Sequence, residues 1–241
     1  MNNYLIIIPA RYQSSRFPGK PLADIHGKSM ISRVWDKCIQ AANPERILVA
    51  TDDERIKIHC QENGMQVEMT SSNCLTGTDR LYEVAKKRKS DIYINVQGDE
   101  PLISPEDIKA VIDASQKEPE ITFNAMCSIK NEDDFRSPNV PKVVTRKDGS
   151  LLYMSRAPVP TNKQLGFEKA MKQVCIYAYP RDVLIAFGSL KEKTPLESIE
   201  DLEILRLLEF GYTVKMIEVS GSSIAVDTPQ DLETVKSMIH D

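Results

Sequence analysis

The stretch from Ile6 to Leu22 reads IIIPARYQSSRFPGKPL. A continuous apolar run of this kind predicts a strand that is buried on both faces, as in a parallel sheet. The run ends abruptly in a loop that carries Arg11, Arg16 and Lys20 and no acidic residue. We therefore expect a central strand that delivers a basic loop to the edge of a sheet.

The composition of this loop suits a polyphosphate. Ser14 and Ser15 are small hydroxyl residues, a Pro18-Gly19 break follows them, and backbone N–H groups combine well with arginine and lysine side chains around phosphate oxygens. Neither GxxxxGK[ST] nor GxGxxG is present. A solvated surface loop whose charges pair elsewhere fits the spacing equally well.

The rest of the chain alternates strand and helix patterns. A buried-strand pattern at 46–51 and further strand patterns at 66–70, 91–97 and 213–220 are separated by helical segments. This alternation predicts an α/β fold with an open, mostly parallel sheet flanked by helices. Residues 1–241 are expected to form a single domain that includes a smaller, strand-rich insertion at approximately 130–195, with a hairpin near Asp148-Gly149. A helix is expected over 198–211, and another is expected to begin with a cap at Thr78 or Asp79.

Charge and cysteine content narrow the classes of function. The 241 residues carry a formal net charge of −4, which argues against general nucleic-acid binding and against a membrane-surface role. The five cysteines are scattered without a CxxC pair, so we expect neither a disulfide framework nor a zinc site. No targeting or membrane segment is visible, and a cytoplasmic location is expected.

Two carboxylates follow strands at the expected ligand-binding edge. In open parallel sheets, ligands bind beyond the carboxyl ends of the strands. Asp99 follows INVQG, where Gly98 allows close approach, and Asp227 follows the last strand. Together with a polyphosphate, these carboxylates predict a Mg²⁺ site. The alternatives are a turn residue before a proline for Asp99 and a helix start for Asp227.

Several segments together resemble one enzyme family. IIIPARYQSSRFPGKPL, VATDD, TGTDRL, INVQGDEP, PKVV, MSRAPVP, IYAY and VDTPQDLE occur in order along nearly the whole chain. They resemble the 3-deoxy-manno-octulosonate (Kdo) cytidylyltransferases, or CMP-Kdo synthetases. The resemblance implies a nucleotidyltransferase-type, Rossmann-like fold with a strand-rich dimerisation subdomain, a homodimer, and transfer of CMP from CTP to an acidic sugar with release of pyrophosphate. It also implies a role in lipopolysaccharide biosynthesis.

The resemblance also assigns residues to roles. It implies a catalytic role for Lys20, Arg16 and Asp99, and magnesium ligation by Asp99 and Asp227. The nucleotide-binding positions it implies are Arg11, Ser14, Arg16, Lys20, Ala50, Thr51, Asp52, Ser72, Gly77 and Thr78. The positions it implies around the sugar acid are Gln97, Arg156, Gln173, Tyr177, Glu203 and Ile204.

The chain departs from the family pattern in the part that is expected to bind the sugar acid. Gln173 stands where the family usually has histidine, Cys175 where it has glycine, and Ile204 where it has glutamine. Because lost hydrogen-bonding partners change selectivity, the acceptor is expected to be Kdo or a related acid, such as an 8-amino-substituted octulosonate or a nonulosonate. Two other readings remain open: a nucleotidyltransferase for a different acid or sugar phosphate, and a non-catalytic nucleotide-binding homologue.

Overall fold

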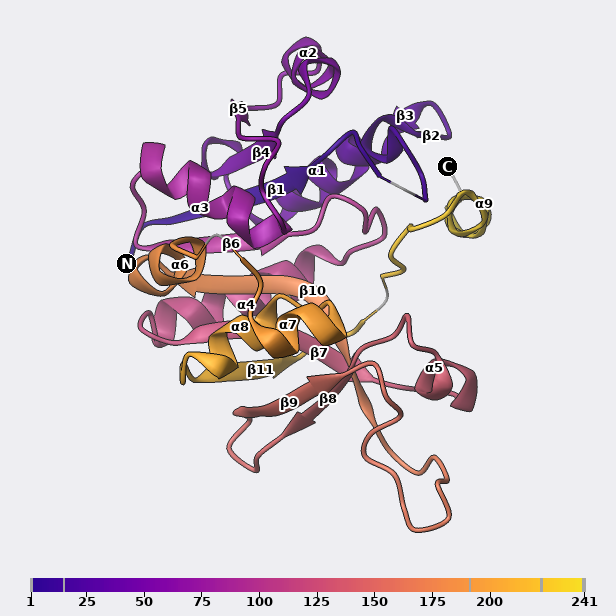
Figure 1. The fold of residues 1–241 in the computed structure, drawn as a ribbon. Helices are drawn as coiled ribbons and strands as arrows, with labels where there is room; N and C mark the ends of the chain where they lie inside the picture. The colour runs from indigo at the N-terminus through magenta and orange to yellow at the C-terminus, as the bar shows by residue number, and fades with distance from the viewer. Residues whose placement is uncertain (1, 15, 191, 222, 240–241) are drawn as a thin grey trace.

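Strand β1 (Tyr4–Ala10) lies in the interior of a nine-stranded sheet whose main path runs β11-β7-β10-β6-β1-β4-β5 (Figure 1). The structure is a computed structural model that describes residues 2–14, 16–190, 192–221 and 223–239. Ile6, Ile7 and Ile8 are fully buried, with Ile6 and Ile8 in one core cluster and Ile7 in the other. The predicted strand, buried on both faces, is confirmed, whereas Ser15 lies outside the described residues.

The other strands also match the predicted α/β alternation. They are β2 (Asp24–Ile25), β3 (Lys28–Ser29), β4 (Ile47–Thr51), β5 (Val67–Met69), β6 (Ile92–Val96), β7 (Thr122–Ser128), β8 (Lys142–Thr145), β9 (Leu151–Ser155), β10 (Met171–Pro180) and β11 (Val214–Glu218). The α-helices are α1 (Met30–Ala41), α2 (Glu54–Glu62), α3 (Gly77–Lys87), α4 (Pro105–Lys117), α5 (Glu132–Arg136), α6 (Arg181–Gly188), α7 (Pro195–Glu200), α8 (Ile204–Glu209) and α9 (Pro229–Met238). Two short 3₁₀ turns cover Lys20–Leu22 and Pro44–Arg46.

Helices cover both faces of the sheet. Side chains of α1 and α4 complete one core cluster, and side chains of α3, α6 and α8 complete the other. Figure 1 shows these two layers on either side of the strands. A separate small cluster joins Leu232 and Val235 of α9, and Val226 before it, to Ile25 of the β2–β3 hairpin and Met30 at the start of α1.

The sheet is mostly parallel, with one antiparallel strand inserted. β1 pairs in parallel with β4 and β6, and β7 pairs in parallel with β11. β10 runs antiparallel between β6 and β7. The hairpin β8–β9, with Gly149 at φ 84° in its turn, attaches to the end of β10 and extends beyond the main sheet (Figure 1).

Two local expectations are wrong. Helix α3 is capped by Thr76, whose side chain forms a reciprocal capping box with Asp79, so the helix begins earlier than the predicted cap at Thr78 or Asp79. The helix expected over 198–211 is two short helices, α7 and α8, because Asp201 adopts a left-handed conformation with φ 51°. After the break, Glu203 and Arg206 contact the first turn of α3, at Thr78 and Asp79.

A buried charge cluster joins α8 to α3, α6 and α7. The Arg206 guanidinium is fully buried, donates two hydrogen bonds of 2.6 Å to Glu197, and donates to Asp79 at 2.9 Å. It also donates to the carbonyl of Phe187, whose ring lies 3.8 Å from the guanidinium carbon. The Arg206 guanidinium therefore neutralises two buried carboxylates, those of Glu197 in α7 and Asp79 in α3.

We expect Arg206→Met to lower the free energy of unfolding by about 3–5 kcal/mol, because it leaves Glu197 and Asp79 buried without their cation. Urea unfolding followed by circular dichroism measures this. Lys236→Met, which removes an exposed pair with Glu233, is the control and is expected to cost less than about 1 kcal/mol. Equal losses for the two variants would contradict the role given to Arg206.

Candidate functional site

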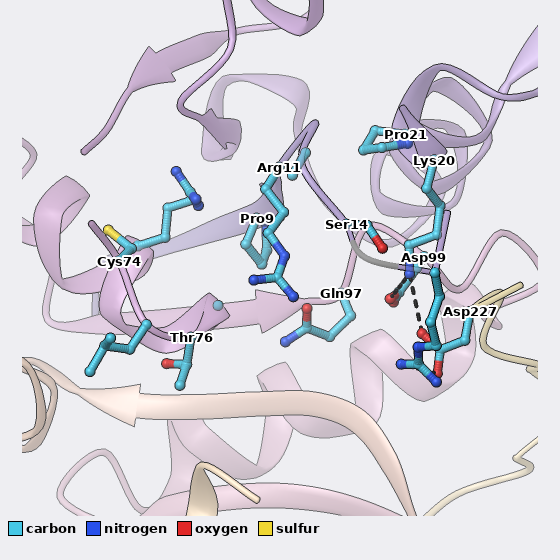
Figure 2. Close-up of a pocket in the computed structure, with 16 residues that line it drawn as sticks. Pro9, Arg11, Ser14, Lys20, Pro21, Cys74, Thr76, Gln97, Asp99 and Asp227 are labelled. Atoms are coloured by element: carbon cyan, nitrogen blue, oxygen red, sulfur yellow. Dashed lines mark hydrogen bonds and ion pairs between the residues drawn. The ribbon is translucent and has the colours of Figure 1, made fainter. Parts of the chain in front are cut away.

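A cavity of about 200 Å³ lies at the carboxyl ends of β1 and β6. Its wall includes eight of the residues singled out from the sequence, namely Arg11, Ser14, Arg16, Lys20, Gly77, Gln97, Asp99 and Asp227. Figure 2 shows Lys20, Asp99 and Asp227 on one side, Cys74 and Thr76 on the other, and Arg11 and Gln97 between them. The basic loop after β1 and the turn after β6 therefore face each other across one space.

A single backbone hydrogen bond brings Asp227 to this cavity. The N–H group of Val226 donates to the carbonyl oxygen of Asp99 at 2.9 Å. The segment before α9 is thereby held against the turn that follows β6. Because Asp227 is the next residue, its carboxylate lies beside that of Asp99, although the two are far apart in sequence.

Two cations hold the two carboxylates. The Lys20 ammonium lies 2.7 Å from Oδ2 of Asp99 and 3.4 Å from Oδ1 of Asp227. Arg16 contacts the other oxygen of Asp227 at 3.1 Å. The side chains of Lys20 and Asp99 are 15% and 29% exposed, so their attraction is only partly screened by water.

The basic loop is shaped by Tyr12. The carbonyl oxygen of Tyr12 accepts a hydrogen bond of 2.8 Å from the N–H of Gly19, which closes the loop. Gly19 has φ 75°, and a Cβ there would lie 3.1 Å from the Tyr12 ring. The Arg55 guanidinium lies 3.3 Å from the centre of the same ring and is fixed by two side-chain hydrogen bonds to Asp53. These contacts hold the loop open towards the cavity.

The opposite wall contains an arginine that sequence reasoning missed. Arg80 lines the cavity, is 3% exposed, and donates to Asp52 at 3.0 Å and to Thr70 at 2.6 Å. Its place directly after TGTD, in the first turns of α3, was the available signal. Cys74 also lines the cavity, and burial raises the pKa of its thiol to about 11, so the thiol is protonated at neutral pH.

A second cavity, of about 570 Å³, adjoins the first and shares Arg16 and Asp227 with it. Gln173 and Cys175 line this cavity. The amide nitrogen of Gln173 donates to Asn124 at 2.9 Å and to the hydroxyl of Tyr177 at 3.0 Å. Asn124 in turn donates to two backbone carbonyls of β10, so this polar group is anchored at the bulge of that strand.

Other predicted positions line neither of these two cavities. They are Ala50, Thr51, Asp52, Ser72, Thr78, Arg156, Tyr177, Glu203 and Ile204. Ala50, Thr51, Thr78 and Ile204 are fully buried, whereas Ser72 is exposed. The guanidinium of Arg156 donates to the carbonyl oxygens of Glu200, Pro138 and Asp201.

The carboxyl group of Glu203 is buried beside the first turn of α3. Its Oε2 accepts a hydrogen bond of 3.1 Å from the N–H of Thr78, and within the described residues its Oε1 has no hydrogen-bond partner. Burial raises the pKa of Glu203, and hydrogen bonds from Thr78 only partly oppose this. A buried and half-satisfied carboxyl group is costly to keep and is typical of a functional position.

The protein alone offers few metal ligands. Residues 2–14, 16–190, 192–221 and 223–239 contain no cluster of three or more His, Cys, Asp or Glu side chains suited to a metal ion. Asp99 and Asp227 are two hard oxygen donors, and Mg²⁺ is commonly held by one or two carboxylates together with substrate phosphates. Within the same described ranges, no helix has the length and apolar character needed to cross a bilayer.

Comparisons with known proteins point to one family. A sequence model described as cytidylyltransferase matches residues 5–217. The chain is 44% identical over 241 residues to a 3-deoxy-manno-octulosonate cytidylyltransferase from Syntrophotalea carbinolica, covering 96% of each chain. It is 41% identical over 239 residues to the protein of the same name from Escherichia coli, covering 99% of this chain and 97% of that one.

Solved structures agree with the sequence comparisons. A CMP:2-keto-3-deoxy-manno-octonic acid synthetase complexed with CTP superposes with a TM-score of 0.91 at 40% identity, covering 98% of each chain. A putative glucose-1-phosphate thymidylyltransferase from Bacillus anthracis has a TM-score of 0.70 at 18% identity, which shows a shared fold alone. The predicted nucleotidyltransferase-type fold is confirmed.

We expect Glu203→Gln to stabilise the protein at neutral pH, because glutamine keeps an acceptor for Thr78 without a buried charge. The folded-state pKa of Glu203 is raised, so the folded protein binds more protons than the unfolded chain above pH 4.5. As the pH rises above 4.5, the free energy of unfolding of the wild type therefore falls relative to that of Glu203→Gln. Below pH 4.5 the pH-dependent part of this difference disappears. Chemical unfolding across a pH series measures this, with exposed Glu120→Gln as the control. A gain that does not depend on pH would contradict the assignment.

Proposed function

Because this chain belongs to the 3-deoxy-manno-octulosonate cytidylyltransferase family, we propose that it transfers CMP from CTP to Kdo or a closely related 3-deoxy-2-ulosonic acid, with release of pyrophosphate. It is a nucleotidyltransferase by family. The observation that carries the assignment to this site is the joint placement of the basic loop and two carboxylates around one cavity.

The basic loop is proposed to bind the triphosphate. Arg11, Arg16 and Lys20 line the cavity together with the hydroxyl-bearing Ser14. The Arg11 guanidinium lines the cavity, and among the described residues Asp201 lies close enough for the charge of Arg11 to help lower its pKa. Gly98 lets the turn after β6 pack closely on β1, since a Cβ at Gly98 would lie 2.8 Å from the carbonyl oxygen of Pro9.

The proposed reaction needs positioning and charge neutralisation more than covalent chemistry. The anomeric hydroxyl of the acid attacks the α-phosphorus in line, a new P–O bond forms, and the bond to the β-phosphate oxygen breaks. Lys20 and Arg16 stabilise the charge that develops on pyrophosphate. Asp99 and Asp227 suit a Mg²⁺ ion, which when bound supplies further charge neutralisation at the phosphates.

The second cavity is proposed to take the sugar acid. It adjoins the proposed triphosphate site through Arg16 and Asp227, and Gln173 lines it. Gln97 is proposed to meet the acid from the first cavity, and Tyr177 to orient Gln173 by accepting its hydrogen bond. Arg156, Glu203 and Ile204 line neither cavity, so any effect they have on the acid is proposed to be indirect. Gln173, which lines this cavity in place of the usual histidine, supports an acceptor that differs in detail from Kdo.

Self-association and cellular setting are also proposed. The strand-rich part at approximately 130–195 and the adjoining α7 carry exposed large apolar side chains, at Leu152, Leu165, Leu196 and Ile199. Ile199 is 80% exposed, which supports burial in a homodimer. We place the enzyme in the cytoplasm, in lipopolysaccharide biosynthesis, without nucleic-acid or membrane partners.

The test is release of pyrophosphate from CTP in the presence of Mg²⁺ and a panel of acids that contains Kdo, an 8-amino octulosonate and a sialic acid. We expect turnover with at least one octulosonate, loss of turnover in excess chelator, and a loss of about 100-fold or more in Asp99→Asn. Arg16→Ala is expected to raise the KM for CTP with nearly unchanged thermal unfolding.

Controls separate the alternatives. ATP, GTP and UTP in place of CTP, and a sugar phosphate in place of the acid, test the other nucleotidyltransferase readings. Binding of CTP without turnover of any acceptor would favour the non-catalytic homologue. Full activity in Asp99→Asn or in chelator would reject the proposed metal site.

A further inference from the structure

The ammonium group of Lys20 occupies the space between the two site carboxylates. It lies 2.7 Å from an oxygen of Asp99 and 3.4 Å from an oxygen of Asp227, while Arg16 contacts the second oxygen of Asp227. Figure 2 shows the Lys20 side chain directed at both acids. The two cations and the two carboxylates balance one another in charge.

This arrangement is unfavourable for a divalent ion. Mg²⁺ requires oxygen ligands at about 2.0–2.1 Å in near-octahedral geometry. The oxygens of Asp99 and Asp227 that face the shared space already accept from Lys20. A divalent ion placed there would also meet the positive charge of Lys20 at close range, in a region where the lysine side chain is only 15% exposed.

We propose that Lys20 is a positioning residue with two alternating partners. Before nucleotide binds, Lys20 holds Asp99 and Asp227 together and keeps a divalent metal ion from them. When a nucleoside triphosphate enters, its phosphates draw Lys20 away, and the carboxylates become available to the metal. The release of Lys20 by the triphosphate rests on the proposed function, whereas the exclusion of metal by Lys20 in the nucleotide-free protein does not.

The exchange predicts an order of binding. Metal alone binds the free protein weakly, and metal binds well only with, or after, the triphosphate. A lysine that served the phosphates alone would leave the carboxylates open to metal at all times. Removing the Lys20 charge therefore has opposite effects on two measurements, because it weakens turnover and strengthens binding of metal to the nucleotide-free protein.

The experiment is a titration of nucleotide-free protein with Mn²⁺ alone. Electron paramagnetic resonance measures the free Mn²⁺ at each step, and isothermal titration calorimetry measures the binding affinity independently. We expect Lys20→Met to bind Mn²⁺ about tenfold or more tightly than the wild type. Lys20→Arg keeps the positive charge and should bind as weakly as the wild type. Lys28→Met, which removes an exposed lysine paired with Asp36, is the matched control and should change nothing.

The double variant Lys20→Met with Asp99→Asn locates the effect. It should lose the gain in Mn²⁺ affinity if the ion binds the carboxylate pair. Retention of the gain, or no gain in the folded Lys20→Met protein, would overturn the proposal. Circular dichroism establishes folding, and Lys20→Gln serves as the second variant if Lys20→Met does not fold.

The Mn²⁺ titration tests the exchange at Lys20 independently of the proposed cytidylyltransferase activity. The Mn²⁺ titration contains neither CTP nor an acceptor, so a gain in Lys20→Met stands even if no acid is turned over. Conversely, normal cytidylyl transfer by the wild type together with unchanged Mn²⁺ affinity in Lys20→Met would keep the enzyme assignment and reject the exchange at Lys20.

Discussion

Strand β1 is buried on both faces, and this burial determines how the helices are layered around the sheet. Ile6 and Ile8 require one helical layer and Ile7 requires another, so the chain must pass repeatedly over both sides of the sheet. Parallel neighbours on both edges of β1 follow from such crossovers. Their carboxyl ends then meet at one edge, where the basic loop and the turn at Asp99 are brought face to face.

The site is completed by a segment that the parallel part of the sheet does not supply. The antiparallel strand β10 separates β6 from the β7–β11 pair, so the last strand ends far along the sheet from β1. The chain then returns across the edge, and the hydrogen bond from Val226 to Asp99 fixes its position. Packing of Leu232 and Val235 of α9 on the β2–β3 hairpin secures the return at its other end. The relative position of Asp99 and Asp227 therefore depends on contacts from both ends of the chain.

Local sequence patterns predicted the parts of the structure that local physics determines. Ser29, Ser104 and Thr228 cap helices, as the capping preference of serine and threonine explains, and the buried strand β1 is the apolar run at Ile6–Ile8. The break at Asp201 could not be predicted, because the apolar pattern of 198–211 continues through it. The contacts at the break are non-local, such as those of Arg156 with the carbonyl oxygens of Glu200 and Asp201.

The sequence predicted which loops form the candidate site but not how their charged side chains pair. The loop after β1 and the two acids follow strands, so their common edge can be inferred from topology. Topology does not predict which charged side chains of the site pair with one another. Arg80 was missed because its pairing with Asp52 joins the start of α3 to the end of β4. That Lys20 contacts both acids depends on the return of the chain at Val226, which has no local sequence signal.

Unsatisfied polar atoms gather at the first turn of α3. The amide nitrogen of Asn95 donates to the hydroxyl of Thr78 at 3.4 Å, and the N–H of Thr78 donates to Glu203, yet Oδ1 of Asn95 and Oε1 of Glu203 have no partner in the described part of the chain. Each such buried atom costs free energy, and native proteins leave few of them. Apolar residues could fill the same space, as Ile204 does alongside. These two unmet acceptors therefore leave the start of α3 less stable than an apolar filling would. The stability lost here is offset elsewhere in the same helices, where Arg206 satisfies both of its acids.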